Sequence, residues 1–485
     1  MAGCNRPFPP LLQRSRSELK ILLLLAAAAL PSHAGTGAST AATTPARFTE
    51  ATGVSQPPAA LRDGCWWTIF ADPELDALIE RGRAANGDVA IAAARVSLAR
   101  AALRGAEAER MPHAGAVAGV SGQTGALINA AGGSGAVYQL GIGIGYEVDL
   151  LGRLSKSARA ARLDAKAAAE SLEGVRLIAE ADIAQTYFTL RSLDAEAALL
   201  ERGAAKARDS VAIAERRQQD GFGTALDVER LRGERATIEA DRRVLERERA
   251  AASHALALLI GDGKPVALGP WTPPAVPEIP AGLPSEMLTR RPDVAASVDA
   301  IDAARLRLRA TKAAWFPSFG LTASGGQAST SLGDLLGSAA RSFGFSLLLA
   351  LPIFDGGRHK AAVRKSEAEL ELSTAESRQI VLRSFREVDD QLSAARLLAE
   401  EEGEARQAAE ADERARSLAE RRFAEGNVSR LDLLDAERVG LADQRRLSQV
   451  RHARYVATVN LVRALGGGWS DDRSAAPLAL NQSAR

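Results

Sequence analysis

The residue types that most often carry catalysis or bind metals are scattered along this chain. His113, His254, His359 and His452 show no spacing that would bring them to a single metal ion. The chain also has no His-Glu-x-x-His, Cys-x-x-Cys, Gly-x-Ser-x-Gly or phosphate-binding glycine-rich motif. We therefore expect no enzymatic activity, no cofactor and no resident metal.

One glycine pattern invites a nucleotide-binding interpretation. Gly141, Gly143 and Gly145 alternate with apolar residues inside the stretch 139–148, but the spacing that a dinucleotide-binding loop needs for its third glycine is missing. Successive side chains of a strand point to opposite faces. We therefore interpret these glycines as the small-residue face of a strand.

The charge balance excludes nucleic acid as the main partner. The 485 residues include 61 Lys and Arg against 60 Asp and Glu, which gives no basic field for a phosphate backbone. Hydrophobic residues make up 46% of the chain, but aromatic residues only 4%. This composition favours long helices packed through small side chains.

The segment 1–34 predicts a signal peptide. Basic residues precede the apolar run 21–30, and Ser32-His33-Ala34 fits the small-x-small pattern that signal peptidase favours. The apolar run is too short for a membrane-spanning helix, which needs about 20 residues. We expect an extended segment over 35–74 to follow.

The sequence is an internal duplication. A shift of 205 residues superposes Pro112 on Pro317, Gly152-Arg153 on Gly357-Arg358, and a Gly-x4-Leu-Asp segment at 221–227 on one at 426–432. We expect a first repeat at 75–264 and a second at 285–469. A proline-rich extended connector, 265–284, joins them, and 470–485 forms a flexible tail.

Each repeat predicts the same order of elements. Helix formers fill 75–110 after Asp72 and Pro73, which suit a helix N-terminus, and 285–314 is the counterpart. Two strands follow, and then a long helix over 153–220 or 358–425, about 100 Å at 1.5 Å per residue. A last helix, 226–260 or 431–465, returns antiparallel after a tight turn. Steps of four and three residues between Val381 and Ala399 predict a coiled-coil seam.

The strands decide between a helical scaffold and a membrane protein. Residues 139–148 and 342–351 alternate apolar with small or polar residues, and 117–121 and 319–323 are their expected partners. One apolar face fits a strand that meets lipid, and taken singly it fits a strand facing a protein core as well. The signal peptide and the long helices, which offer no compact partner, favour lipid. The lipid-facing side chains would be Leu140, Ile142, Ile144, Phe343, Phe345 and Leu347.

Four strands per chain cannot close a barrel, because about eight strands are the practical minimum. The chain must therefore oligomerise. Two, three or four copies would give about 8, 12 or 16 strands, and geometry alone does not choose among them.

Several motifs in one order resemble a known family, the TolC-type outer-membrane efflux channels, in particular their OprM and NodT-like branch. The resemblance covers nearly the whole mature chain. Besides the two Gly-x4-Leu-Asp turns, its carriers are Trp66-Trp67-x-x-Phe70-x-Asp72-Pro73-x-Leu75, Tyr146-x-x-Asp149-Leu150-Leu151-Gly152-Arg153, Leu288-x-Arg290-Arg291-Pro292-Asp293-Val294, Phe316-Pro317-Ser318 and Pro352-x-Phe354-Asp355-Gly356-Gly357-Arg358.

The resemblance implies a mostly α-helical fold with a small β part. Its duplicated half would form, as a homotrimer, a twelve-stranded outer-membrane β-barrel continued by a twelve-helix periplasmic α-barrel. The chain would be the exit duct of a tripartite efflux system, passing drugs or other small solutes from an inner-membrane pump of the resistance-nodulation-division type and a periplasmic adaptor. The alternative is a soluble periplasmic coiled-coil scaffold or adaptor without a pore.

The same resemblance gives the turns a role at the periplasmic tip. Their glycines suit a left-handed helix end and their hydroxyls can cap the next helix; adaptor docking is expected at Gly221, Thr224, Leu226, Gly426, Ser429 and Leu431. The closed aperture would be lined by Asp227, Asp432, Asp435, Phe423 and Arg430. Arg430 and Arg230 are close enough in sequence to pair with these carboxylates, although solvated helix-end charges are the alternative. Relatives often carry Tyr in place of Phe423.

Overall fold

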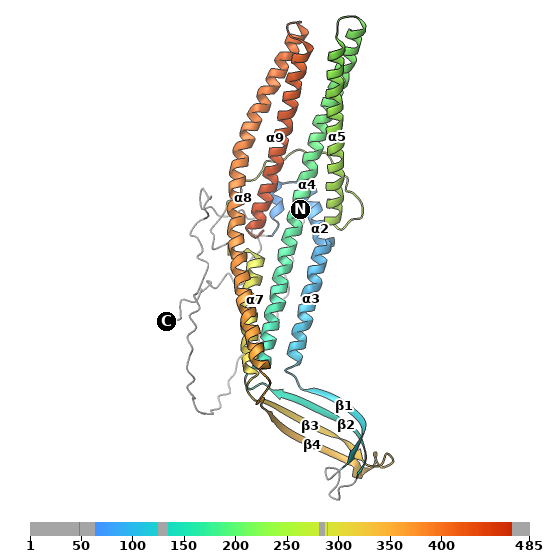
Figure 1. The fold of residues 1–485 in the computed structure, drawn as a ribbon, viewed down its shortest axis with the longest axis vertical. Helices are drawn as coiled ribbons and strands as arrows, with labels where there is room; N and C mark the ends of the chain where they lie inside the picture. Colours follow the sequence, from blue (N-terminus) through green and yellow to red (C-terminus); the bar gives the residue numbers. More distant parts are fainter. Residues whose placement is uncertain (1–47, 49–63, 125–133, 281–286, 289, 468–485) are drawn as a thin grey trace. The chain divides into compact units, whose positions relative to one another are not determined.

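The computed structural model describes residues 48, 64–124, 134–280, 287–288 and 290–467 (Figure 1). The chain divides into residues 1–41 and a larger unit, 42–485, that holds every described element. The expected signal peptide, 1–34, and the tail, 470–485, lie outside the described residues, as does most of the segment 35–74.

A 3₁₀ helix, η1, precedes the first repeat, whose described part contains four α-helices and two strands. Their bounds are η1 Trp66–Phe70, α2 Pro73–Ala85, α3 Gly87–Ala108, β1 His113–Thr124, β2 Ser134–Val148, α4 Arg153–Gln219 and α5 Ala225–Leu259. Asp72 caps α2 as expected, because its side chain accepts the N–H groups of Glu74 and Leu75.

The second repeat has the same order. Its elements are α7 Pro292–Ala313, β3 Ser318–Ser329, the short 3₁₀ helix η2 Ser338–Ala340, β4 Arg341–Ala350, α8 Arg358–Ala424 and α9 Arg430–Ala464. The helices α3, α4 and α5 and the strand β1 recur as α7, α8, α9 and β3, each shifted by 205 residues. Residues 265–280, the described part of the connector, form neither helix nor strand.

Two helices are shorter than their sequence patterns indicate. The expected helix 75–110 is broken at Asn86, whose extended backbone ends α2 and whose side chain accepts the N–H groups of Asp88 and Val89 to begin α3. The expected helix 285–314 is interrupted at Pro292, which begins α7 because proline has no N–H and suits a first turn.

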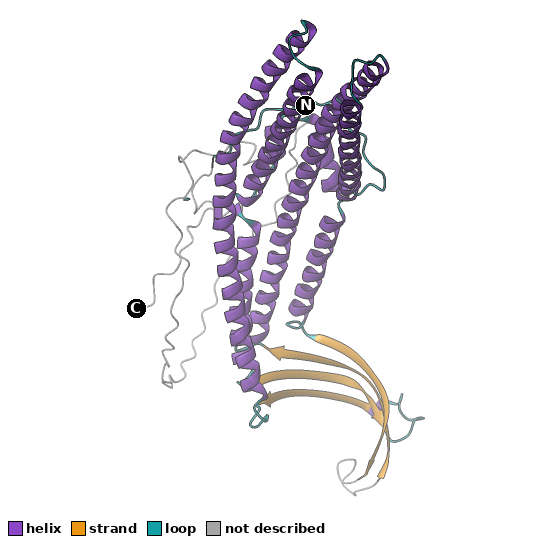
Figure 2. Ribbon diagram, turned by 45° about the horizontal axis from the view of Figure 1, so that its top comes forward, coloured by secondary structure: helices purple, strands orange, loops and turns teal. Residues whose placement is uncertain are grey.

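The four strands form one antiparallel sheet in the order β1-β2-β3-β4 (Figure 2). The central pairing joins the two repeats, since Ile144 on β2 lies opposite Ala323 on β3. The strands have 12, 15, 12 and 10 residues, so β1 and β3 are more than twice as long as expected. Within the described chain, β1 and β4 each have a neighbour on one side alone.

The helices α4 and α8 have 67 residues each and pack against α5 and α9 (Figure 1). No helix in the described residues combines the length and the apolar character that a membrane crossing requires. The coiled-coil seam expected between Val381 and Ala399 lies on α8. Its residue Val388 is buried, whereas Ala399 is exposed in the single chain.

Most of the buried rings gather in one cluster where η1 meets α2, α4 and α9. Trp66, Trp67 and Phe70 are at most 1% exposed, and Phe188 on α4 stacks on Tyr455 of α9 with ring centroids 4.4 Å apart. Offset or stacked rings add to the stabilisation from area burial alone. This cluster holds the N-terminal segment and both repeats together.

Candidate functional site

The two turns expected at the tip are built alike. Gly221 and Gly426 have φ of +80° and +79°, the left-handed region that only glycine adopts without strain. In the first turn Phe222 N–H donates to Arg217 O over 2.8 Å, and Gly221 N–H donates to Gln218 O over 3.1 Å. Asn427 and Gly426 make the corresponding bonds in the second turn. This is a Schellman motif, so the prediction of a glycine-ended helix is confirmed at both sites.

The hydroxyl caps are also confirmed. The side chain of Thr224 accepts the N–H of Asp227 over 3.1 Å. Ser429 and Asp432 form a capping box, in which each side chain bonds the backbone N–H of the other. Two hydrogen bonds lower the pKa of the Asp432 carboxyl: the larger effect comes from the Ser429 hydroxyl and the smaller from the Ser429 backbone N–H. Asp432 therefore keeps its negative charge below neutral pH.

Within the described part of the single chain, neither Arg430 nor Arg230 pairs with an aperture carboxylate. The guanidinium of Arg430 donates to Ser210 Oγ over 2.6 Å and lies 5.5 Å from the ring centre of Phe423. Asp435 pairs with Arg438 over 2.9 Å. Within the single chain, Asp227 bonds only its own cap, and no described ion pair involves Arg230. Each carboxylate instead bonds a partner three residues away, which is a cap hydroxyl for Asp227 and Asp432 and Arg438 for Asp435.

The first turn exposes apolar side chains above a small core. Phe222 is 80% exposed and Leu226 is 58% exposed. Beneath them Val211, Leu231 and Leu434 form a buried cluster that holds α4, α5 and α9 together. The side chain of Leu431 lies outside what the structure describes.

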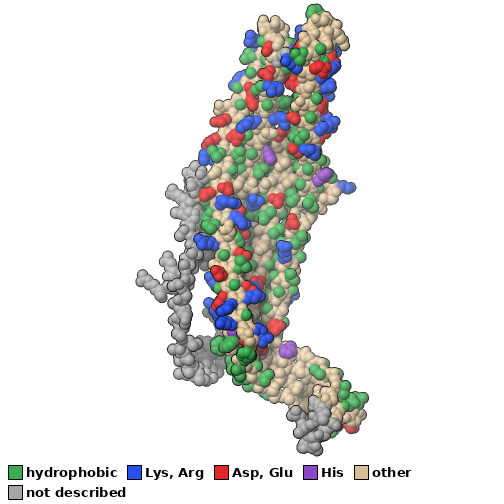
Figure 3. All heavy atoms as spheres, in the orientation of Figure 1, with side chains coloured by type: hydrophobic (Ala, Val, Ile, Leu, Met, Phe, Trp, Pro, Cys, Tyr) green, Lys and Arg blue, Asp and Glu red, His purple; other side chains and the backbone are tan. Residues whose placement is uncertain are grey.

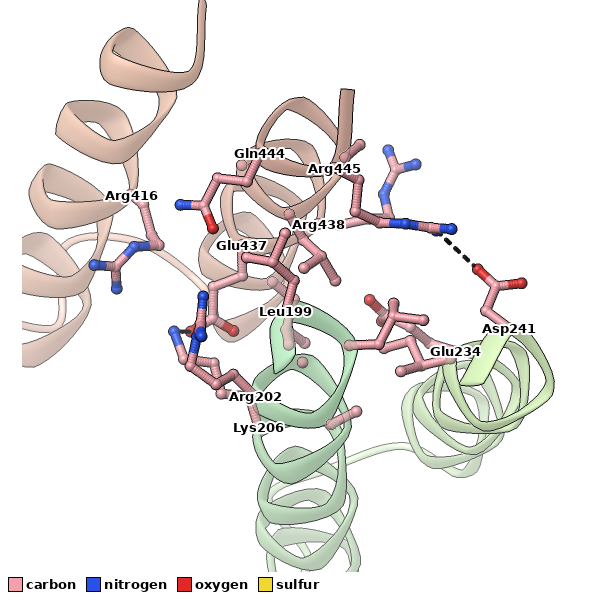
Figure 4. A pocket seen from close by; sticks show the side chains of 18 of the residues that line it. Leu199, Arg202, Lys206, Glu234, Asp241, Arg416, Glu437, Arg438, Gln444 and Arg445 are labelled. Atoms are coloured by element: carbon pink, nitrogen blue, oxygen red, sulfur yellow. Dashed lines mark hydrogen bonds and ion pairs between the residues drawn. The ribbon is translucent and has the colours of Figure 1, made fainter. Parts of the chain in front are cut away.

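A charged cavity of about 960 Å³ lies between the two helical hairpins (Figure 4). Figure 4 shows Arg202 and Lys206 reaching it from α4, Asp241 from α5 and Arg416 from α8. Burial raises the pKa of Glu234 on its wall, and the nearby Arg438 opposes that shift. No sequence motif indicated this cavity. The available signal was the four-residue spacing of Glu437, Leu441 and Arg445, which puts them on one face of α9.

Polar contacts across this cavity connect the repeats. Lys206 Nζ on α4 lies 3.0 Å from Glu437 Oε1 on α9. Arg445 on α9 lies 3.1 Å from Asp241 on α5. One turn further along α9, beyond the cavity lining, Gln449 donates to Glu196 on α4 over 3.1 Å. Within the described residues, no group of three His, Cys, Asp or Glu could hold a metal ion.

The sheet register puts all six expected lipid-facing residues on one face. Ile142, Gly325 and Phe343 lie opposite one another across β2, β3 and β4. The other expected residues are two or four positions away along their strands, so their side chains point to the same face. Every one of the six is exposed, from 45% for Leu140 to 86% for Phe343. The other face carries Gly141, Gly143 and Gly145, so the glycines lie in a strand as interpreted.

The chain matches the family model described as outer membrane efflux protein twice, over residues 78–262 and 283–467. It is 32% identical to outer membrane protein OprJ of Pseudomonas aeruginosa over 419 residues, which covers 84% of this chain and 87% of the relative. It is 32% identical to the toluene efflux pump outer membrane protein TtgI of Pseudomonas putida over 410 residues, with 83% and 87% covered. It is 30% identical to the cation efflux system protein CusC of Escherichia coli over 411 residues, with 83% and 88% covered.

Solved structures agree with these sequence matches. The outer-membrane channel OprN is 27% identical and superposes with a TM-score of 0.81 over 89% of this chain and 98% of that chain. The open state of the Neisseria gonorrhoeae MtrE outer membrane channel is 27% identical, with a TM-score of 0.78 over 88% and 96%. Both repeats, the sheet and the paired long helices therefore have counterparts in outer-membrane channels, and the chain belongs to the outer membrane efflux protein family.

Proposed function

We propose that this chain forms, as a homotrimer, the outer-membrane exit duct of a tripartite efflux system. The observation that carries the proposal is the sheet, which is apolar on one exposed face and free at β1 and β4 within the described chain. Free edges invite pairing with another chain, and a closed barrel removes them. Three copies would supply about twelve strands, enough to enclose a water-filled lumen.

The glycine and serine face of the sheet would then line the lumen. Gly141, Gly143 and Gly145 leave space there, and Thr322 and Ser346 share a hydrogen bond of 2.6 Å on the same face. Because β2 leads into α4 within five residues, the lumen would continue into a tunnel of long helices. Solute would pass through passively, with no reaction and no energy coupling in this chain.

We place the partners at the other end of the long helices. A periplasmic adaptor would dock on both tip turns. The first turn contributes Gly221, Thr224 and Leu226, and Phe222 and Leu226 expose apolar surface there. The second turn contributes Gly426, Ser429 and Leu431. An inner-membrane pump of the resistance-nodulation-division type would deliver solute through that adaptor. TtgI and CusC are named for toluene and for cations, so we infer that the pump and not the duct selects the cargo.

The aperture would be formed by Asp227, Asp432 and Asp435 from three copies, with Phe423 and Arg430 behind them. Such rings concentrate negative charge in a narrow opening and favour cations there. Opening would separate the hairpins α4–α5 and α8–α9, and contact with the adaptor would bias this two-state movement.

Two measurements test the proposal. Detergent-solubilised protein from outer-membrane fractions should have the mass of three chains in light scattering. The same sample should conduct ions when added to a planar lipid bilayer. Release of the protein by osmotic shock without detergent, and no conductance, would instead support the soluble periplasmic scaffold, which the family matches do not favour.

A further inference from the structure

Within the described residues, the chain passes between an α-helix and a strand at four places, and all four expose large apolar side chains. These crossings are 109–112, 149–152, 314–317 and 351–357. We call their exposed residues the apolar collar, and its main members are 47–92% exposed: Met111, Leu150, Trp315, Phe316, Ile353 and Phe354. Exposed apolar surface of this extent marks a contact with a partner or a membrane.

The collar residues come from distant parts of the sequence but lie together. A cavity of about 540 Å³ is lined by Leu150, Phe316 and Leu351, from three different crossings. The ring of Trp315 lies 4.7 Å from the ring of His359, the second residue of α8. The collar therefore reaches the beginning of the long helices.

Both long helices begin with basic residues and without acidic ones. In α8 the exposed residues Arg358, Lys360, Arg364 and Lys365 precede the first acid, Glu367. In α4 the basic residues are Arg153, Lys156, Arg159 and Arg162, and the first acid is Asp164. The N-terminal end of a helix is positive and normally favours acidic side chains. Asp149 and Asp355, just before α4 and α8, accept N–H groups of the first turns, so each helix end has one acid and an excess of cations that an anionic partner would neutralise.

Several of these cations are free to meet such a partner. Lys360 and Arg364 form no ion pair within the described part of the chain, whereas Arg153 is held by Glu147. From Arg358 to Arg364 the helix rises about 9 Å. That distance is about one Debye length at physiological salt, so all of α8's first basic residues would feel one charged layer. Figure 3 shows hydrophobic side chains gathered where α8 meets the sheet and Lys and Arg on the helix beside them.

We propose that the collar and these basic turns together bind anionic phospholipids of the outer-membrane leaflet that faces the periplasm. This inference rests on the proposed function, because it needs the sheet in the membrane. The apolar side chains, with Trp315 and Phe316, would lie at the boundary of the acyl chains, where aromatic rings favour the interface. Arg358, Lys360 and Arg364 would contact lipid phosphates, each strengthening binding about fivefold near an anionic surface.

The test uses the fluorescence of Trp315 in the reconstituted full chain. The wild type and Trp315→Phe are placed in vesicles containing lipids brominated on their acyl chains, and the difference isolates the quenching of Trp315. One series contains brominated phosphatidylglycerol, and the other contains brominated phosphatidylcholine. We expect the anionic lipid to bind at least threefold more tightly. Sodium chloride at about 1 M should remove this preference, since it shortens the Debye length to about 3 Å.

A charge-neutral variant and a matched control locate the site. R358Q/K360Q/R364Q should bind the two lipids equally, whereas R378Q/R383Q/R386Q, which removes three exposed cations about 30 Å further along α8, should keep the preference. Planar-bilayer conductance of each sample shows first that the channel is inserted. Equal quenching by both lipids in a conducting wild-type sample overturns the lipid proposal alone, as does a Trp315 that neither lipid quenches because another copy covers it. A wild type that neither inserts nor conducts overturns the proposed function instead.

Discussion

Trp66 donates its indole N–H to the buried carboxylate of Glu180 over 3.0 Å, which ties η1 to α4. Arg83 on α2 lies 3.1 Å from the other carboxylate oxygen. Burial is the main cause that raises the pKa of Glu180 to about 7, although Arg83 and Trp66 favour the charged form. This contact joins the N-terminal segment to the first repeat through a group that titrates near neutral pH.

Glu180 should make stability fall as pH rises from about 4.5 to about 7. Its pKa is higher in the folded chain than in the unfolded chain, so the folded state binds more protons in this window. Ionising the buried carboxylate costs about 3 kcal/mol, because the pKa differs by about two and a half units. E180Q keeps an acceptor for Trp66 and removes that charge. We expect its apparent melting temperature to exceed that of the wild type at pH 8 and to match it near pH 4.

The control for this pH profile is E80Q. Glu80 is exposed and pairs with the same Arg83 over 3.3 Å, and its charge is a minor cause of the raised pKa of Glu180, so its removal disturbs the ion pair and leaves the burial of Glu180 in place. Its melting temperature should follow the wild-type pH profile. A wild-type melting temperature that does not change between pH 5 and pH 8 would show that Glu180 titrates elsewhere.

Asp72 should be the most sensitive residue of the N-terminal segment. One carboxylate oxygen caps α2, and the other accepts Tyr187 O–H over 2.7 Å and Trp271 N–H over 2.9 Å. D72A removes a helix cap and leaves one buried donor, Tyr187, and one partly buried donor, Trp271, without this acceptor, for a loss of about 3 kcal/mol or more. Y187F removes one of these bonds and should cost about 1 kcal/mol. Thermal melts followed by circular dichroism compare the two, and equal losses would contradict a shared hub at Asp72.

Local signals made the helices and their ends predictable. Gly221 and Gly426, with Thr224 and Ser429, specify both tip turns through bonds between residues at most five apart. The sequence predicted the position of β1 and β3 but made both too short, because they contain glycine, alanine and serine without strong alternation. The break at Asn86 was missed because a single Asn-Gly pair competes with the Ala, Leu, Glu and Arg residues that dominate both sides of it.

Contacts between residues far apart in the chain could not be predicted from the sequence. The motif Trp66-Trp67 was visible, but nothing in its spacing indicates that Trp66 meets Glu180, 114 residues away. The same holds for Lys206 and Glu437, which join the repeats at the charged cavity. Such pairs depend on the packing of α4 against α9, and helix periodicity fixes the face of each helix without fixing its partner.

Two glycines with similar backbones should respond differently to a methyl group. Gly221 has φ +80° and open space where a Cβ would lie, whereas a Cβ on Gly261, with φ +68°, would be 2.3 Å from Ala85 O. G221A should cost about 1 kcal/mol of backbone strain. G261A adds a clash with backbone and should cost clearly more, as measured by the apparent melting temperature. G233A, within α5 and with open space around its Cβ, should stabilise the helix slightly.

Equal losses for G221A and G261A would show that the chain relaxes around Ala85. A large loss for G221A alone would indicate that the first tip turn is packed against another chain. In the isolated protein that chain would be another copy, because a free turn has room for the methyl group.

Asp432 and Asp435 should control the conductance of the closed channel. If three copies bring these carboxylates to the aperture, D432N/D435N removes six negative charges there. We expect a higher single-channel conductance in planar bilayers and weaker cation selectivity in reversal-potential measurements. Because its capping bonds lower the pKa of Asp432, the wild type should keep part of its selectivity at pH 4.5. The control is E400Q, an exposed residue in the middle of α8, which should change neither property. Unchanged conductance and selectivity in D432N/D435N would place these aspartates away from the aperture, whereas an effect in E400Q of similar size would assign the selectivity to the general charge of the tunnel.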